Sequence, residues 1–306
     1  MGHHHDHQNQ SGKNLKIAFL LNLGFTIIEF VGGFYVNSVA IISDAVHDLG
    51  DSISLGSAWY LEKKSAKASN SSFSFGYKRF SLLGALINSI LLIAGSLFVI
   101  TKAINRFIYP EASNADGMIV FAIFGILVNG YAAWKVSGGK TLNERIISWH
   151  LVEDVLGWVA VLLVAIVLQF YDNKYLDPAL SVLIALYILY HVFKNLKETL
   201  TIFLQATPSG IDFSELEVEF LKVDQVASLH HTHVWSLDGQ QHVFTTHVKL
   251  RNIESLTELL VIKKQIRVIL KPYNFKHHTV EVELSTEDCR MESEIIQHKF
   301  NFSHKF

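Results

Sequence analysis

The sequence predicts an α-helical membrane protein in which six transmembrane helices are followed by a small cytoplasmic α+β domain. The chain of 306 residues is 50% hydrophobic, and its mean hydropathy is +0.27. Only 18% of the residues are charged, whereas soluble globular proteins average about 25%. The apolar excess is gathered in long runs, and the periodic pattern of a soluble domain begins only after the last of them.

Each of the apolar runs is long enough to cross a hydrocarbon core, which takes about 20 residues of helix. The runs are Leu15–Val36, Val39–Leu61, Phe80–Thr101, Asp116–Val136, Ile146–Tyr171 and Leu176–Leu204. The first run is too long for the apolar region of a signal peptide and leads into the second without a small-residue cleavage site. We therefore expect it to be a span, and an even number of spans places both termini on one side.

Basic residues indicate which side that is. The connections after the second and fourth spans carry Lys63, Lys64, Lys67, Lys78, Arg79, Lys135, Lys140 and Arg145. The alternate loops hold only Lys174, although Lys102 and Arg106 lie near the outer end of the third span. Because Lys and Arg concentrate on the cytoplasmic side, we expect both termini to be cytoplasmic.

Polar segments flank the spans. The predicted domains are a His-rich cytoplasmic tail (1–14), a six-helix transmembrane domain (15–207), a cytoplasmic domain (208–286) and a polar C-terminal tail (287–306). Pro208 and Gly210 end the last apolar helix, since both residues are helix terminators.

The cytoplasmic domain shows alternating helical and strand periods. The predicted elements are a helix at 213–223, strands at 226–235 and 242–250, a helix at 255–271 and a strand at 279–284. This α-β-β-α-β order is that of a small ferredoxin-like domain.

Charge and cysteine usage exclude some functions. The formal net charge is −2 and the sequence pI is near 6.8, so nothing points to a nucleic-acid partner. The only cysteine is Cys289, which rules out an intrachain disulfide.

Four ionisable residues form a stripe on the second span. Asp44, His47, Asp48 and Asp51 are spaced i, i+3, i+4 and i+7, so they share one helix face. An aspartate at the bilayer centre costs about 2.5–3.5 kcal/mol even on a lenient insertion scale. The stripe therefore needs a polar cavity or a partner helix.

The fifth span offers that partner, because His150 and Asp154 repeat the i, i+4 spacing of His47 and Asp51. Two such helices face to face supply two imidazole nitrogens and two carboxylate oxygens, a tetrahedral set that zinc accepts. The absence of thiolates disfavours copper(I), and the mixed donor set disfavours calcium and magnesium. The sequence therefore predicts a zinc site between the two spans.

Other polar residues in the spans have weaker interpretations. Asn22 and Glu29 in the first span and Asn88 in the third either line an ion path or bond a neighbouring helix. His191 fits a packing role, and Asp177 fits a cap on its own helix.

At this point the chain resembles the cation diffusion facilitator family of zinc transporters. The motifs that carry the resemblance are Ser43–Asp51, Phe75–Arg79, Leu83–Asn88, Leu142–Asp154, Asp177–Pro178, Thr207–Pro208 and His230–Trp235. They are spread over nearly the whole chain.

The resemblance implies a homodimer that exports zinc from the cytoplasm against a proton gradient, with His47, Asp51, His150 and Asp154 as the transport site. His at the first of these positions is typical of the zinc-selective members. The resemblance also implies a cytoplasmic metal site. Its candidate ligands are His230, His247 and Glu283, with His233 and Cys289 as further candidates.

Some features depart from the family pattern. Ser81 stands where glutamate is common, and the loop 62–79 contains no His or Asp that could form an additional metal site. The connection between the fourth and fifth spans lacks a His-rich insertion, which favours a bacterial-type protein in the inner (cell) membrane. We interpret the N-terminal histidines as a zinc-collecting tail; they are His3, His4, His5 and His7. A purification tag would be an unbroken run of histidines, whereas Asp6 interrupts this one.

The expected mechanism is alternating access. Zinc displaces protons from His47 and His150, and external protons later displace zinc, because metal ligands must be deprotonated. Asp44 and Asp48 either relay ions or orient the histidines. A membrane metalloenzyme and a membrane metal sensor remain alternatives. A metalloenzyme is disfavoured because a catalytic zinc keeps an open coordination position, whereas the four predicted ligands close the site. A sensor would need the cytoplasmic site but not the intramembrane one.

Overall fold

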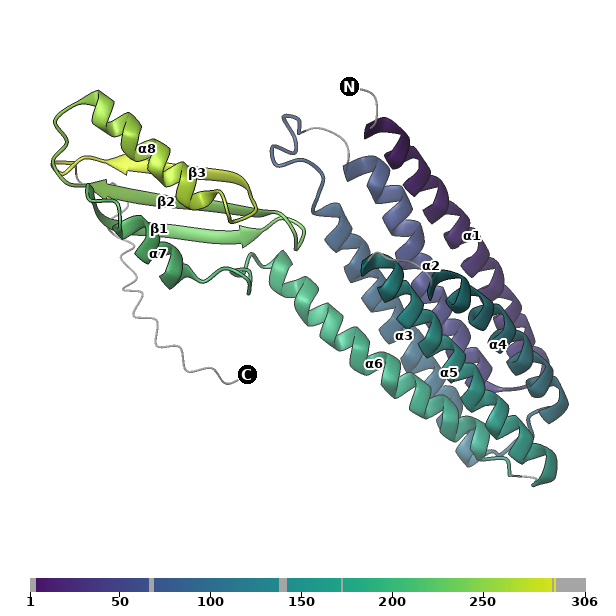
Figure 1. The fold of residues 1–306 in the computed structure, drawn as a ribbon. Coiled ribbons are helices and arrows are strands. Elements are labelled where there is room, and N and C mark those ends of the chain that lie inside the picture. The colour runs from purple at the N-terminus through teal and green to yellow at the C-terminus, as the bar shows by residue number, and fades with distance from the viewer. Residues whose placement is uncertain (1–3, 66–68, 138–141, 172, 288, 290–306) are drawn as a thin grey trace. The chain divides into compact units, whose positions relative to one another are not determined.

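The chain consists of a helical unit and a unit built on a small sheet (Figure 1). A computed structural model describes residues 4–65, 69–137, 142–171, 173–287 and 289. The contacts separate two compact units, Met1–Thr199 and Leu200–Phe306. The chain is therefore mostly helical with a C-terminal sheet, as the sequence predicts.

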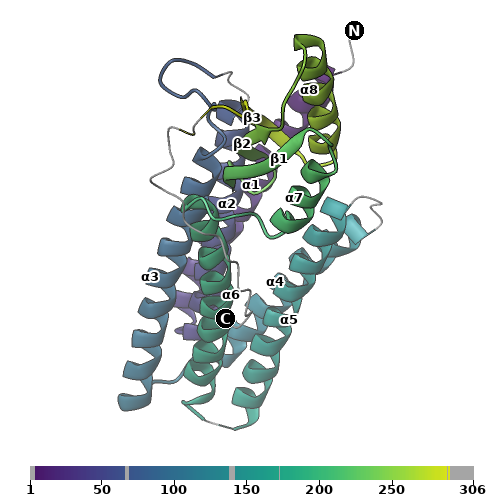
Figure 2. The ribbon, with the colours of Figure 1, turned by 90° about the vertical axis from the view of Figure 1, so that its left-hand side faces the viewer.

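Long helices lie alongside one another in the first part of the chain (Figure 2). They are α1 (His4–Tyr35), α2 (Val39–Ser65), α3 (Phe80–Ile108), α4 (Ala115–Ser137), α5 (Leu142–Phe170) and α6 (Leu176–Phe203). Among the described residues, four segments are long and apolar enough to cross a membrane, namely Phe80–Ile108, Ala115–Trp134, Leu151–Phe170 and Leu176–Phe203.

The remaining two helices differ in composition. The apolar part of α1 is shorter, Phe19–Tyr35, and α2 carries the acidic stripe among its apolar residues. Carboxylates lower the hydropathy of a helix, so α2 does not stand out as a membrane span by composition.

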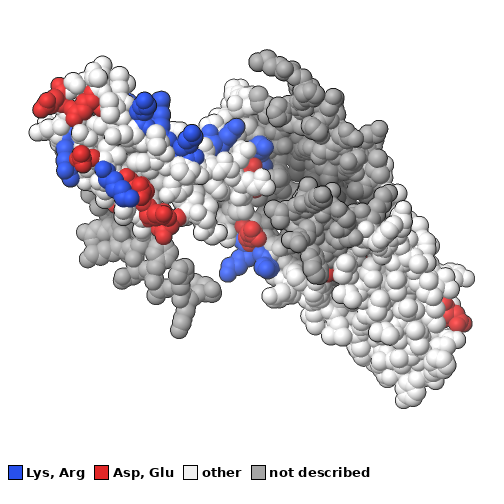
Figure 3. Space-filling view, viewed as in Figure 1, with Lys and Arg blue, Asp and Glu red and all other residues white. Residues whose placement is uncertain are grey.

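The helices bury small residues and expose large apolar ones, as is typical of a membrane protein. In α3, the small residues Ser89, Ser96 and Ala103 are buried, while Ile90 and Leu97 are exposed. Figure 3 shows charged side chains gathered over the sheet unit, whereas the visible described surface of the helices is nearly uncharged. Apolar side chains that face outward fit a lipid environment, and small residues let helices approach closely.

Close helix packing is clearest between α4 and α5. A Cβ atom added at Gly125 of α4 would lie 2.2 Å from the Trp158 ring of α5. Trp158 is 1% exposed and belongs to a core that also contains Val36, Ile41 and Met118. This core therefore joins α4 and α5 to the start of α2.

Asp177 links α6 to the start of α2. It lies in the first turn of α6 but is 2% exposed, and it accepts hydrogen bonds from the backbone N–H groups of Val39 (2.8 Å) and Ala40 (3.3 Å). The Ser38 hydroxyl donates a third bond, at 2.5 Å. Asp177 therefore lies at the positive end of α6, as expected, but its hydrogen bonds go to another helix. Its carboxylate caps the N–H groups that begin α2, which sequence spacing does not reveal because the partners are 137–139 residues apart.

The sheet unit has the predicted element order. It consists of α7 (Phe213–Leu221), β1 (Val226–Ser236), β2 (His242–Leu250), α8 (Leu256–Leu270) and β3 (Phe275–Glu283). Asp212 and Ser255 cap the two helices through side-chain oxygens. The strand order is β1-β2-β3, with β1 antiparallel to β2 and β2 parallel to β3.

One face of the sheet packs against the helices, and the other carries polar residues. Phe244 and Val248 of β2 lie in a core with Phe220 of α7 and Ile262 of α8. Successive strand residues point to opposite faces, so His247 lies on the face opposite this core.

Candidate functional site

Three of the four predicted transport ligands come together between α2 and α5. The His47 Nε2 atom lies 3.9 Å from Asp51 Oδ2 and 3.8 Å from Asp154 Oδ1. Donor atoms of a tetrahedral zinc site with bonds of about 2.0–2.2 Å are roughly 3.4 Å apart. The two distances from His47 are slightly longer than this spacing. Among the described residues, Asp51 and Asp154 do not also come close enough to each other to complete a metal-binding group with His47. The backbone of His150 belongs to α5, but its side chain lies outside the described residues.

The helices explain why these donors converge. His47 and Asp51 are one turn apart on α2, and Asp154 reaches them from α5. On the same side of α2, Asp44 faces Gly157 of α5, where an added Cβ would lie 3.5 Å from the carboxylate. This distance is that of an ordinary van der Waals contact, so Asp44 packs directly against α5 at Gly157.

Further carboxyl groups are buried beside these donors. Asp44 and Asp48 are each 5% exposed, and Glu29 of α1 is 1% exposed. Glu29 interacts electrostatically with Asp48, Asp44 and Asp154, in decreasing order. The structure therefore places the predicted path residue Glu29 beside the acidic stripe.

The two asparagines form hydrogen bonds between helices. Asn22 Nδ2 donates to the Asp48 carbonyl and to Ser52 Oγ of α2, both at 3.0 Å. Asn88 Nδ2 of α3 donates to Ser54 Oγ of α2 at 2.7 Å. The sequence left open whether these side chains line an ion path or bond a neighbouring helix. Both of them form hydrogen bonds to α2, as the second interpretation predicts.

The sheet unit contains a second group of potential ligands. His230, His247, Glu283 and Cys289 each offer one ligand atom within 4.8 Å of the others. Glu283 Oε1 lies 2.8 Å from His247 Nδ1, Glu283 Oε2 lies 3.0 Å from His230 Nε2, and Cys289 Sγ lies 3.8 Å from His247 Nδ1. The donors come from β1, β2, β3 and the segment after β3, on the sheet face away from the core.

Glu283 is the centre of this group. It is 4% exposed. Burial alone would raise its pKa, but hydrogen bonds from His247 and Cys289 and the charge of His230 hold the pKa of this carboxyl below its usual value. A carboxylate that stays ionised beside two imidazoles and a thiol is a donor set that suits zinc, so these residues fit a bound metal.

A β-bulge changes which histidines join the group. The pairing register of β1 shifts between His230 and His233, and His231 adopts a φ of 48° there. His233 is exposed and pairs with Thr245, outside the group. The His231 ring instead lies 5.4 Å from that of His230 and 5.3 Å from that of His247, measured between centroids. Sequence alternation did not indicate this placement of His231, because a register shift of this kind has no simple sequence signal.

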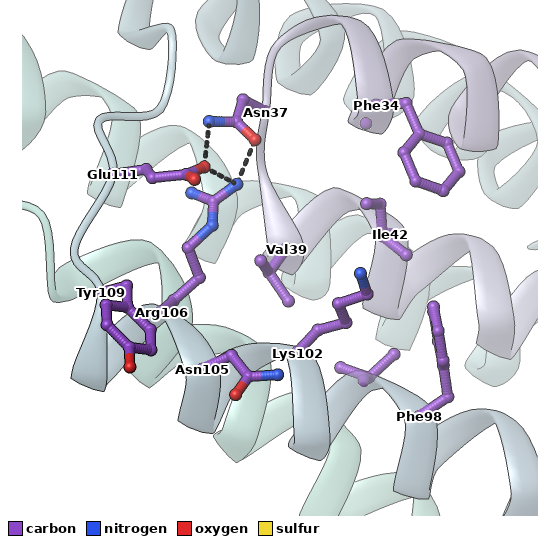
Figure 4. Close-up of a pocket in the computed structure, with 12 residues that line it drawn as sticks. Phe34, Asn37, Val39, Ile42, Phe98, Lys102, Asn105, Arg106, Tyr109 and Glu111 are labelled. Carbon is purple, nitrogen blue, oxygen red and sulfur yellow. Dashed lines mark hydrogen bonds and ion pairs between the residues drawn. The ribbon is translucent and has the colours of Figure 1, made fainter.

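A separate cavity of about 350 Å³ lies where α3 meets the turn between α1 and α2 (Figure 4). Arg106 contacts Asn37 through Nη2, which also lies 3.4 Å from Glu111 Oε2. Lys102 lines the same cavity. None of the predicted transport ligands lines it, so this cavity is distinct from the His–Asp group.

Comparison with known proteins places these geometries in context. A family model described as "Cation efflux transmembrane domain" matches residues 15–204. The chain is 34% identical to the cadmium, cobalt and zinc/H(+)-K(+) antiporter of Bacillus velezensis, over 94% of each chain. It is 31% identical to the metal cation efflux system protein CzcD of Cupriavidus metallidurans, over 93% of this chain and 90% of that one. It is 29% identical to the zinc transporter ZitB of Escherichia coli, over 97% and 98%.

Proposed function

Because the chain belongs to the cation efflux family, we propose that it is a secondary active transporter that exports zinc from the cytoplasm in exchange for protons. The observation that carries this proposal is the approach of His47 on α2 to Asp154 on α5, at 3.8 Å. It brings an imidazole and a carboxylate from separate helices to one point within an integral membrane protein. His150, one turn before Asp154, completes a tetrahedral set in this proposal.

The proposed membrane arrangement has six spans. α1 and α2 join the four apolar helices, with the acidic stripe of α2 turned away from lipid. Both termini and the sheet unit are cytoplasmic in this arrangement, in the inner (cell) membrane, because the basic connections lie on that side. The transporter works as a homodimer, and its sheet unit has a ferredoxin-like arrangement.

The exchange follows from competition for the same atoms. Zinc binds neutral imidazole and ionised carboxylate, so it replaces protons when it enters from the cytoplasm. Helices that carry the group then expose it to the outside, where a higher proton concentration displaces the metal. In this mechanism Asp44 and Asp48 either relay ions or orient His47.

The range of ions extends beyond zinc. The Bacillus relatives are named for cadmium, cobalt and zinc, and for exchange with both protons and potassium. Imidazole and carboxylate donors bind several divalent transition metals, so we expect cadmium and cobalt as further substrates and potassium as a candidate counter-ion.

The cytoplasmic group is proposed to be regulatory. Zinc would be held by His230, His247, Glu283 and Cys289. The bound ion would cross-link β1, β2, β3 and the segment after β3. Occupancy would favour the dimer competent for transport, and the N-terminal histidines would collect zinc on the same side of the membrane.

Zinc flux into proteoliposomes tests the transport proposal. Wild type, Asp154→Ala and the control Asp116→Ala are reconstituted with an internal zinc indicator and a pH gradient. Asp116 is an exposed carboxylate in the first turn of α4, away from the donors. We expect flux that follows the gradient in wild type and the control and is lost in Asp154→Ala. Wild type that binds zinc without flux would contradict the proposal.

A further inference from the structure

A polar seam joins α1 to α2. Asn22, Thr26 and Glu29 are spaced i, i+4 and i+7 on α1, so they share one face. Asn22 donates to the Asp48 carbonyl and to Ser52 Oγ, both at 3.0 Å, and Thr26 Oγ1 lies 3.5 Å from Ser52 Oγ. The seam therefore holds α1 against the acidic face of α2.

Glu29 is the member of the seam whose bonding is incomplete. The residue is 1% exposed, and no described group donates a hydrogen bond to either carboxylate oxygen. Its hydrogen-bonding neighbour is another acid, the side chain of Asp48. Buried polar groups in native proteins nearly always have a partner. Two buried carboxyl groups can bond each other only through a shared proton or another bridging cation, so this pair points to a bound cation that no side chain supplies.

The surroundings specify the charge of that ligand. The groups that interact with Glu29 are Asp48 and Asp44 from α2 and Asp154 from α5, all of them acidic. From α4, the neighbouring contacts to α1 are aromatic, with Phe121 against Gly32. No described lysine or arginine forms an ion pair with Glu29.

Charge balance makes the need for a cation explicit. A zinc ion bound by two carboxylates and two neutral imidazoles forms a neutral group, which leaves nothing to neutralise Glu29. A buried ionised carboxylate without a counter-charge is strongly disfavoured. The same holds for Asp44 and Asp48, and the Glu29–Asp48 pair therefore needs at least one bound cation during part of the transport cycle.

We propose that Glu29 binds the monovalent counter-cation, a proton or a potassium ion, that this transporter exchanges for its metal. The inference rests on the proposed function and assigns one of its two ions to a residue. When zinc arrives beside Asp154, its charge repels the cation held nearby. For a proton, the O–H bond of Glu29 breaks, the electron pair stays on the carboxylate, and the proton leaves on water.

Proton counting tests this assignment on the purified full-length chain. Zinc is added in weak buffer with a pH indicator, and zinc binding is measured in parallel. We expect Glu29→Gln to bind zinc but to release about one proton fewer per zinc than wild type, and Glu29→Asp to restore the release. Asp116→Asn, which removes an exposed carboxylate, controls for general charge effects.

Potassium forms the second arm of the test. Zinc affinity is measured in potassium and in choline buffer. If potassium is the bound cation, it weakens zinc binding to wild type and not to Glu29→Gln. Unchanged proton release together with an unchanged potassium response in Glu29→Gln would overturn the assignment.

A spectroscopic readout covers the case in which Glu29→Gln does not fold. An infrared difference spectrum of wild type should lose the C=O band of a protonated carboxyl group on zinc binding in choline buffer. That band should shift in Glu29→Asp. A band that is absent or identical in the two proteins, with no effect of potassium on zinc affinity in either, would also overturn the assignment.

The two levels of the proposal fail separately. Wild type that releases Glu29-dependent protons on zinc binding but moves no zinc would contradict the transport function alone. Zinc flux whose coupling to protons and potassium is the same in wild type and Glu29→Gln would contradict the role of Glu29 alone.

Discussion

Single residues on α2 and α5 form the proposed transport site. His47 lies within 3.9 Å of both Asp51 and Asp154, although the two aspartates come from different helices. The helical i, i+4 spacing predicted the His47–Asp51 pair directly. The meeting with Asp154 depended on a partner helix, which the repeated spacing in the fifth span indicated.

The first prediction concerns metal affinity. Asp154→Asn keeps the shape of the side chain but removes the charge that balances a divalent cation. Loss of a residue that only supports a ligand typically costs 10–100-fold in metal affinity, so loss of a ligand should cost more than about 100-fold. Calorimetric titration with zinc measures this, and equal affinity for Asp154→Asn and wild type would show that Asp154 is not a ligand.

The second prediction concerns pH. The pKa of Glu283 is lowered on folding, so the folded state favours the ionised carboxylate. Its contribution to the free energy of unfolding is complete above the unfolded value of 4.5 and is lost as the pH falls through the lower folded value. Metal-free wild type should therefore lose stability below about pH 4.5 more steeply than Glu283→Gln. Denaturant unfolding of the sheet unit in the full chain, followed at several pH values, measures the difference, and parallel curves would contradict it.

Sequence reasoning at this scale worked where the local geometry was regular. His230 and His247 were expected on neighbouring strands, and they pair directly. The ring of His231 lies beside this pair, and His233 lies outside the group, because alternation assumes an unbroken strand and the register shifts after His230.

Elements are held together by contacts that hydropathy does not detect. The four apolar helices could be predicted from length and composition, because lipid-facing side chains dominate them. The link between α6 and α2 through Asp177 could not, since it depends on which helix ends meet in space.

The third prediction concerns that link. Asp177→Ala leaves two N–H groups at the start of α2 and the Ser38 hydroxyl without their acceptor. Removal of a helix cap or a buried acceptor costs about 1–3 kcal/mol. We expect a lower thermal midpoint for Asp177→Ala in detergent and little change for the control Asp116→Ala, whose carboxylate is exposed. Equal midpoints for both variants would show that the contact contributes little.

The fourth prediction compares two glycines. An added methyl group at Gly125 would lie 2.2 Å from the Trp158 ring, whereas nothing lies within 4 Å of one at Gly24. Gly125→Ala should therefore destabilise the α4–α5 pair by about 1–3 kcal/mol. Gly24→Ala should be neutral or stabilising, because alanine favours a helix by about 1 kcal/mol over glycine. Thermal unfolding of the two variants measures this, and a destabilised Gly24→Ala would contradict the packing argument.

At the scale of the whole molecule, the chain carries two different groups of potential metal ligands, one in each compact unit. The helical unit presents imidazole and carboxylate donors that suit a transported ion. The sheet unit adds a thiol, from Cys289, to two imidazoles and a carboxylate. Thiolate donors raise the affinity for zinc, so the cytoplasmic group should fill at lower zinc concentrations than the transport group.

The last prediction follows from this difference. If the cytoplasmic group regulates transport, His247→Ala should raise the zinc concentration needed for half-maximal flux and leave the maximal rate nearly unchanged. His278→Ala, an exposed histidine of β3 outside the group, is the matched control.

Zinc flux in proteoliposomes, with zinc-dependent dimer mass measured in parallel, distinguishes regulation from transport. Removal of a ligand of the transported ion, such as Asp154, abolishes flux at every zinc concentration. A regulatory ligand shifts only the concentration at which the dimer forms and flux begins. If His247→Ala matches His278→Ala in both measurements, the cytoplasmic group has no part in activation, and its role reduces to the stability of the sheet unit.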